Sequence, residues 1–125
     1  MDDKALIAEA ARMVSRAYAP YSGFRVGACV LTQSGQAYCG CNVENASYGL
    51  TICAERAAVF AAVAAGETGL ATLAVVSDSA KKPMPCGACL QVMSEFDVKR
   101  VIVGAKDMGF EVYELKDLLP KPFRP

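Results

Sequence analysis

Three cysteines and one glutamate stand in two short runs of this 125-residue sequence, Cys53-Ala54-Glu55-Arg56 and Pro85-Cys86-Gly87-Ala88-Cys89. The spacing of Cys86 and Cys89 lets one turn of chain present both sulfurs to one metal ion, as in many zinc sites, although redox-active dithiols share it. Cys53 supplies a third thiolate, and no fourth ligand matches it. Because structural zinc sites are normally closed by four ligands and catalytic sites keep a position for water, three ligands favour a catalytic zinc site.

Glu55 and Arg56 end the first of these two runs, at the expected start of a helix. A carboxylate beside a zinc ion can take a proton from water and return it to a leaving group. Zinc with three thiolates carries a net charge of −1, so we expect Arg56 and the helix N-termini to compensate it. The alternatives are a purely structural zinc or buried thiols, with Glu55 an ordinary first-turn carboxylate.

Composition narrows the class of protein. Hydrophobic residues make up 54% and charged residues 21% of the sequence, which is typical of a globular fold. Thirteen basic and thirteen acidic residues balance, so no nucleic-acid partner is expected, and no apolar run reaches the ~18 residues of a membrane span. There is no histidine, which excludes Ser-His and Cys-His catalysis and histidine-ligated metals. Six cysteines without a secretory leader favour a reducing cytoplasm over a disulfide framework.

Hydrophobic periodicity predicts the elements that position these residues. We expect helices at 3–18, 52–65 and 87–96, strands at 26–31, 37–42, 73–77, 100–103 and 110–113, and a short helix or turn at 113–119. The order predicts a mixed sheet flanked by helices, a three-layer α/β/α arrangement in one domain spanning 1–125. The alanine-rich helix at 52–65 is expected to be central and buried near a subunit contact, or else an ordinary helix on one sheet face.

The remaining cysteines, Cys29, Cys39 and Cys41, fall in predicted strands. Cys39 and Cys41 share a face at the strand period of two. Free cysteine is commonly buried, so we expect packing roles for all three and leave them out of the site.

The two cysteine runs resemble the signature of zinc-dependent cytidine deaminases, Cys- or His-x-Glu followed by Pro-Cys-x-x-Cys. Without histidine, the chain is similar to the three-cysteine variant, the small homotetrameric enzymes that act on free nucleosides. The resemblance extends to Tyr18–Ala28 and Asn42–Tyr48 and covers nearly the whole chain. It implies the cytidine deaminase-like three-layer fold.

The resemblance also implies substrate contacts. Phe24 would pack on the pyrimidine, and Asn42 and Glu44 would hold the sugar 3′-hydroxyl in a loop that also contains Tyr48. Ala54 and Glu55 would contact the base. Phe123 would close the site of a neighbouring subunit.

Two departures from the family pattern bear on these expectations. Leu90 follows the last cysteine where many relatives carry arginine, so charge compensation is expected to rest more heavily on Arg56. The chain ends two residues after Phe123, which is shorter than in several relatives.

The function implied is hydrolysis: cytidine and 2′-deoxycytidine become uridine and deoxyuridine, with release of ammonia, in pyrimidine salvage. Glu55 would move the protons, with one zinc per subunit of a cytoplasmic homotetramer. The alternatives are a deaminase of another cytosine nucleoside such as blasticidin S, and a non-catalytic zinc-stabilised module. The Asn42–Asn45 loop favours a simple ribose.

Overall fold

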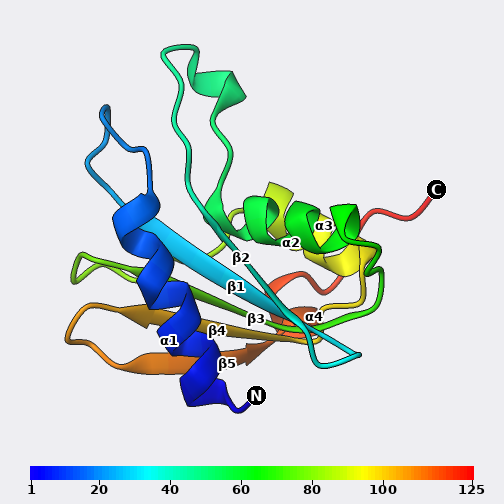
Figure 1. Cartoon of the computed structure of the whole chain (residues 1–125). Coiled ribbons are helices and arrows are strands. Elements are labelled where there is room, and N and C mark those ends of the chain that lie inside the picture. The colour runs from blue at the N-terminus through cyan, green and yellow to red at the C-terminus, as the bar shows by residue number, and fades with distance from the viewer.

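A five-stranded mixed sheet in the order β2-β1-β3-β4-β5 forms the middle of the computed structural model, which describes residues 1–125 (Figure 1). β1 is antiparallel to both of its neighbours, β3 and β4 are parallel, and β5 is antiparallel to β4. The strands are β1 Val26–Thr32, β2 Ala37–Cys41, β3 Leu70–Ser77, β4 Arg100–Ala105 and β5 Phe110–Glu114.

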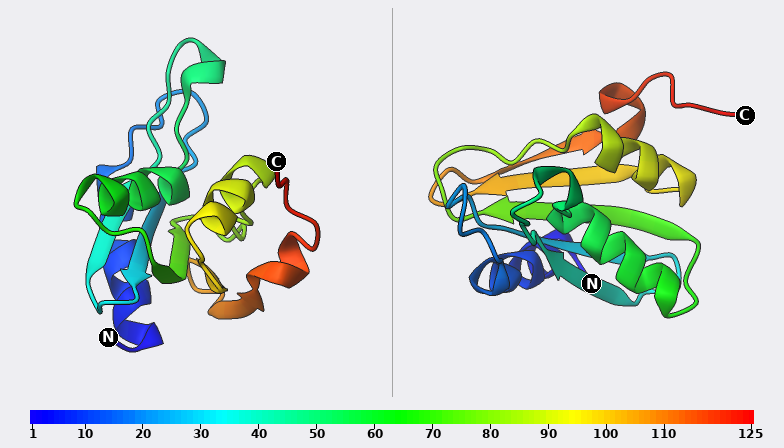
Figure 2. Two further views of the ribbon diagram at one scale, coloured as in Figure 1. Left: turned by 90° about the vertical axis from the view of Figure 1, so that its right-hand side faces the viewer. Right: turned by 90° about the horizontal axis from the view of Figure 1, so that it is seen from above.

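Helices cover both faces of this sheet, so the predicted three-layer α/β/α arrangement is confirmed (Figure 2). α1 (Asp3–Met13) lies on one face, while α2 (Ala54–Ala64) and α3 (Gly87–Glu95) lie side by side on the other. A short α4 (Leu115–Leu118) follows β5, and 3-10 turns occupy Val14–Arg16 and Tyr48–Leu50. None of the helices combines the length and apolar character that a membrane span requires.

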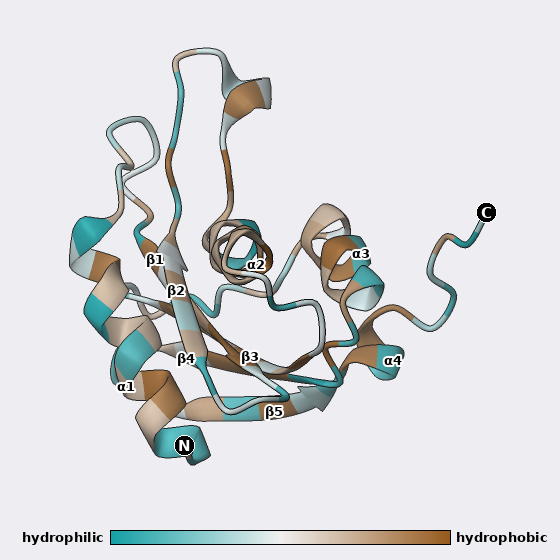
Figure 3. Cartoon of the chain, turned by 45° about the vertical axis from the view of Figure 1, so that its right-hand side comes forward, coloured by the Kyte–Doolittle hydropathy of each residue, from teal (hydrophilic) through white to brown (hydrophobic).

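Alternating side chains along β1 separate the two hydrophobic clusters. Ala28 and Val30 belong to the larger cluster under α2 and α3, whereas Cys29 belongs to the smaller cluster under α1. This follows from the strand period of two, which sends successive side chains to opposite faces. Figure 3 shows the resulting band of hydrophobic strands between the helices.

Two glycines allow the helices to lie close to the sheet. A Cβ on Gly27 would lie 2.1 Å from the Ala10 carbonyl oxygen in α1. A Cβ on Gly40 would lie 2.5 Å from the Ala58 backbone nitrogen in α2. The sheet therefore sets the position of α2, the helix that begins beside Cys53.

Most predicted elements exist, with shifted boundaries. The first helix ends at Met13, not residue 18, because the chain turns and Tyr18 hydrogen-bonds with Asn42. Asp2 caps it, its carboxylate accepting from the Ala5 N–H at 2.8 Å. β3 begins three residues before the predicted Leu73, since its start pairs with β1.

Within one chain the alanine-rich helix is buried on one side only, and its subunit contact stays a prediction. α2 lies on one face of the sheet, with Ala58, Val59 and Ala62 buried. Phe60 on its outer side is 46% exposed. The ordinary alternative, a helix packed on one sheet face, is what the structure has.

Candidate metal centre and adjoining cavities

The starts of α2 and α3 carry the three cysteines. Cys53 is the N-cap residue of α2, Cys86 is the N-cap residue of α3, and Cys89 lies in the first turn of α3. Because both helices begin at the same end of one sheet face, the three sulfurs lie within 4.8 Å of one another. The predicted convergence of the two cysteine runs is therefore confirmed.

The sulfur geometry fits a zinc ion. The Cys86 and Cys89 sulfurs are 3.7 Å apart. Two sulfurs that share a tetrahedral zinc at bonds of about 2.3 Å would be separated by about 3.8 Å. The donor set also fits, since thiolates are common zinc ligands and both N-cap positions lie at the positive end of a helix.

Arg56 supplies positive charge beside this cluster. Its Nη2 donates to the Cys53 sulfur at 3.3 Å, while its Nε is buried without a hydrogen-bond partner. A hydrogen bond from the Cys89 thiol, together with Arg56, lowers the pKa of Cys53 to about 5. The same bond holds the proton on Cys89 and raises the pKa of that thiol. The cluster thus favours at least one thiolate at neutral pH.

Glu55 is a buried carboxylate next to the sulfurs. Its side chain follows Cys53 in the first turn of α2, and the residue is only 6% exposed. Burial is the main cause that raises its pKa to about 7, and the negative charge of Cys53 acts in the same direction. A carboxyl group with such a pKa can both accept and donate a proton near neutral pH.

A cavity of about 180 Å³ opens onto Glu55, Cys53 and Cys86. Three predicted substrate contacts, Phe24, Asn42 and Ala54, line it. The sequence reasoning missed four further lining residues, Val26, Thr51, Pro83 and Met84. Pro83 and Met84 directly precede the second cysteine run, and that adjacency is the one signal that could have identified them.

Asn42 also fixes the wall of this cavity. Its Oδ1 accepts from the Val26 N–H at 2.9 Å, and its Nδ2 donates to the Phe24 carbonyl at 2.8 Å. The amide therefore holds the chain at the start of β1. One N–H of Nδ2 and one lone pair of Oδ1 remain for another partner.

Glu44 and Tyr48 lie in a second cavity of about 280 Å³, which shares Thr51 with the first. The Tyr48 ring meets the Tyr21 ring edge-on, with 5.9 Å between centroids, and is 75% exposed. The two cavities together place the predicted sugar contacts beside the predicted base contacts.

Phe123 is not brought to either cavity. The Gln91 side chain in α3 holds its backbone, donating to the carbonyl at 3.2 Å and accepting from the N–H at 2.9 Å. Its ring is 74% exposed. The predicted role of Phe123 concerns the site of a neighbouring subunit, so it stays a prediction.

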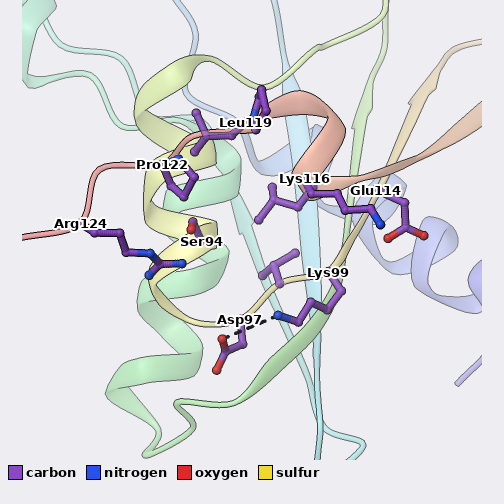
Figure 4. A pocket seen from close by; sticks show the side chains of 11 residues that line it. Ser94, Asp97, Lys99, Glu114, Lys116, Leu119, Pro122 and Arg124 are labelled. Carbon is purple, nitrogen blue, oxygen red and sulfur yellow. Dashed lines mark ion pairs between the residues drawn. The ribbon is translucent and has the colours of Figure 1, made fainter.

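A larger cavity of about 300 Å³ lies between the end of α3, the loop before β4, α4 and the C-terminal tail (Figure 4). Its labelled side chains include both basic and acidic groups, and the Lys99 Nζ lies 3.9 Å from the Asp97 Oδ1. None of the cysteines and no buried carboxylate line it, so we assign the candidate chemistry to the 180 Å³ cavity beside Glu55.

Cys29, Cys39 and Cys41 lie away from the metal cluster. Cys29 is buried beneath α1 and pairs across the sheet with Cys39. Cys39 packs against the same small cluster, while Cys41 is half-buried at the end of β2. Burial raises the pKa of the Cys29 and Cys41 thiols, which suits a packing role.

Comparison with known proteins gives consistent matches. The profile of the family described as "Cytidine and deoxycytidylate deaminase zinc-binding region" matches residues 1–105. A cytidine deaminase of Halalkalibacterium halodurans is 44% identical over 98% of this chain and 95% of its own length. A cytidine deaminase of Mycobacterium tuberculosis is 42% identical over 98% of this chain and 90% of its own length. The solved cytidine deaminase structure from Burkholderia pseudomallei superposes with a TM-score of 0.92, at 46% identity over 98% of this chain and 100% of that one.

Proposed function

The chain belongs to the cytidine deaminase family, and from this we propose that it hydrolyses cytidine and 2′-deoxycytidine to uridine and deoxyuridine, releasing ammonia. It is then a zinc-dependent hydrolase of pyrimidine salvage, with residues 1–125 as one catalytic domain. One observation carries the proposal: three clustered cysteine sulfurs adjoin a buried carboxylate, Glu55, in a cavity that Phe24 lines.

Cys53, Cys86 and Cys89 would hold one zinc ion per subunit. When bound, the zinc supplies an electrophilic centre that lowers the pKa of water at its free position. Arg56 donates to the Cys53 sulfur and offsets the negative charge of three thiolates. No second arginine follows Cys89, where Leu90 stands.

Glu55 would carry both protons of the reaction. It takes one proton from the attacking water and gives it to N3 of cytosine as the new oxygen bonds to C4. It then takes the second proton from that oxygen and gives it to the 4-amino group. The C4–N bond breaks, ammonia leaves, and the Glu55 carboxylate is restored. Burial of Glu55 suits this shuttle because it excludes competing water.

The cavity walls would bind the rest of the nucleoside. Phe24 packs on the base and Ala54 contacts its edge, while Asn42 donates to a sugar hydroxyl and Glu44 accepts from one. Tyr48 flanks the sugar side. A carboxylate in this position disfavours a 5′-phosphate, so we infer that free nucleosides are the substrates.

Glu55→Gln tests the reaction class. We expect the variant to bind zinc and to fold, but to lose turnover of cytidine by roughly 10²- to 10⁴-fold, because an amide cannot shuttle protons. Ultraviolet absorbance of cytidine, with metal content measured in parallel, gives both quantities. Glu95→Gln, an exposed carboxylate at the end of α3, is the matched control and should keep full turnover.

The alternatives give other outcomes in the same assay. A deaminase of a modified cytosine nucleoside would leave cytidine unchanged and convert blasticidin S. A non-catalytic zinc module would convert neither, and Glu55→Gln would then be silent while cysteine substitutions unfold the chain. Full activity of Glu55→Gln would refute the proton shuttle.

We further propose that the enzyme is a cytoplasmic homotetramer. Two adjacent loops project from the body of the molecule (Figure 2). They carry the loop patch, a set of exposed apolar residues: Tyr18, Tyr21, Val43, Tyr48 and Leu50. Exposed apolar residues on two adjacent loops favour contact with another subunit. In such an assembly Phe123 would reach the site of a neighbouring subunit.

A further inference from the structure

Ser22 lies between two groups that the proposed function assigns to the substrate. Its hydroxyl donates to the Glu44 carboxylate, and the same oxygen accepts from the Phe24 N–H at 3.0 Å. A hydroxyl has one donor and two acceptor positions, so both contacts can form at once. One small side chain therefore joins the sugar-side carboxylate to the base-side aromatic residue.

The backbone between Ser22 and Phe24 is shaped for this contact. Gly23 has φ +69°, in the left-handed region that favours glycine. No atom lies within 4 Å of the place where its Cβ would be, so conformation rather than space calls for glycine. This bend carries the Phe24 N–H back to the Ser22 hydroxyl, the local turn that serine side chains commonly stabilise.

Tyr21 and Ser22 occupy most of the hydrogen-bond acceptor positions of the Glu44 carboxylate. Oε1 accepts from the backbone N–H groups of Tyr21 at 3.0 Å and Ser22 at 3.1 Å, and Oε2 accepts from the Ser22 hydroxyl. A carboxylate offers about four acceptor positions. One position remains for a donor from the 280 Å³ cavity, and it is on Oε2, the atom that Ser22 orients.

The two loops do not depend on Ser22 to stay together. The Tyr18 N–H donates to the Asn42 carbonyl at 2.9 Å, and the Glu44 N–H donates to the Tyr18 carbonyl at 2.8 Å. Asn42 holds the Phe24 carbonyl independently. Loss of the Ser22 hydroxyl should therefore change orientation in the site without unfolding its walls.

We propose that Ser22 is a positioning residue whose hydroxyl couples the Glu44 carboxylate to Phe24, aligning the sugar and the base of the bound nucleoside. The inference rests on the proposed function. Ser22 touches no reacting atom, since its partners hold parts of the substrate that keep their bonds. Its effect is uniform binding, which changes KM rather than kcat.

Ser22→Ala and Ser22→Thr are the test variants. For cytidine, Ser22→Ala raises KM about tenfold, the scale expected for a lost hydrogen bond to a charged group, and changes kcat less than about twofold. Ser22→Thr keeps the hydroxyl and restores most of the loss. Equal KM values for the Ser22→Ala variant and the natural chain would overturn the proposal, as would a Thr variant no better than Ala.

A double-mutant cycle with Glu44→Ala separates coupling from a general structural role. Once the carboxylate is absent, Ser22→Ala has a much smaller effect, because the hydroxyl no longer has that group to orient. Additive effects would refute the coupling. Ser34→Ala is the matched control: it removes a serine–glutamate bond of 2.8 Å to Glu67, away from both cavities, and should leave KM unchanged.

Uridine binding by calorimetry distinguishes this inference from the proposed function. If the natural chain binds uridine in a Ser22-dependent way but deaminates no cytosine nucleoside, the proposed function fails and the role of Ser22 stands. If cytidine is converted and Ser22→Ala is silent in both assays, the role of Ser22 fails alone. If there is neither turnover nor uridine binding, both fail.

Discussion

At the scale of single residues, the electrostatics of the metal cluster depend on one arginine. The Arg56 Nη2 donates to the Cys53 sulfur, whereas its Nε is buried without a hydrogen-bond partner. Leu90, and not a second cation, follows the last cysteine. A partner outside the ligand set that supports a metal ligand is typically worth 10- to 100-fold in affinity or activity.

Arg56→Gln should therefore weaken zinc binding by roughly 10- to 100-fold and lower turnover. The reason is that the thiolates lose the charge that stabilises them, while the three ligands themselves remain. Competition with a chromophoric chelator measures the affinity. Arg12→Gln, which removes an arginine bonded to Glu9 on the surface of α1, is the control and should change nothing. Equal zinc affinities in the two variants would contradict this role.

Sequence spacing predicted the site best where the roles are local. Cys53, Glu55, Cys86 and Cys89 belong to helix starts, and helix starts are encoded by adjacent residues. The clamp of Phe123 by Gln91 joins positions 32 residues apart, so no local pattern predicts it. For the same reason, the bond from the Ser22 hydroxyl to Glu44, which joins positions 22 residues apart, is not predicted by a local pattern.

At the scale of elements, the height of α2 above the sheet is set by the glycine in β2. Gly40→Ala would place a Cβ 2.5 Å from the Ala58 nitrogen and 2.7 Å from the Ala57 Cβ. Because the backbone of α2 would have to move to relieve this clash, we expect a loss of about 1–3 kcal/mol in the free energy of unfolding. The substitution should also displace the start of α2. Because Cys53 is the N-cap residue of that helix, zinc binding should weaken as well.

Gly104→Ala in β4 is the matched control for this substitution. Its Cβ would meet its nearest atom, the Gly109 carbonyl oxygen, at 3.5 Å, which is ordinary contact. Urea unfolding of both zinc-loaded variants measures the difference. Equal losses for Gly40→Ala and Gly104→Ala would show that strand glycines as such matter, and not the approach of α2.

The ion pair between α1 and β4 gives a pH-dependent prediction. Arg100 donates to both Asp3 oxygens, at 3.1 and 2.7 Å, and this hydrogen bonding is the main cause that lowers the pKa of Asp3. A lowered folded-state pKa adds stability above the unfolded value of about 3.9, and that stability is lost as pH falls through the folded pKa. Both side chains are more than a third exposed, so the pair contributes about 0.5–1 kcal/mol at most.

Asp3→Asn should therefore reduce the free energy of unfolding by this small amount at pH 7, and the difference between variant and natural chain should shrink as the pH falls below about 3.9. Urea unfolding of both proteins at each pH measures it, and any zinc lost in acid is lost by both. A difference that stays constant from pH 7 to pH 3 would assign the effect to something other than the carboxylate charge.

Most element types were predictable from hydrophobic periodicity or helix propensity, but several ends were set by distant partners. The first helix stops at Met13 because Tyr18 bonds to Asn42 and Glu44. The alanine run of α2 is compatible with burial on every side, and only the packing on β1 and β2 selects one face. Composition alone cannot make that choice.

At the scale of the whole molecule, several large apolar side chains are exposed to solvent, which is energetically unfavourable. Tyr48 is 75% exposed, Leu50 is 65% exposed, and both lie on a projecting loop beside the proposed sugar cavity. Phe123 is 74% exposed and is held firmly by Gln91 rather than left free. A second copy of the chain would cover these surfaces, and closed symmetric assemblies are the usual form of such contacts.

The proposed homotetramer should give one species of four times the monomer mass in sedimentation velocity at micromolar protein. Leu50→Asp places a charge in the loop patch at a residue that lines neither cavity, and should shift the protein toward smaller species. It should also lower turnover, because Phe123 does not reach the cavities of its own chain. Met108→Asp, at an exposed apolar residue of the β4–β5 turn, is the control and should keep the assembly intact. A fully active monomer at this concentration would show instead that one chain completes the site, and that the loop patch is covered by substrate or left to solvent.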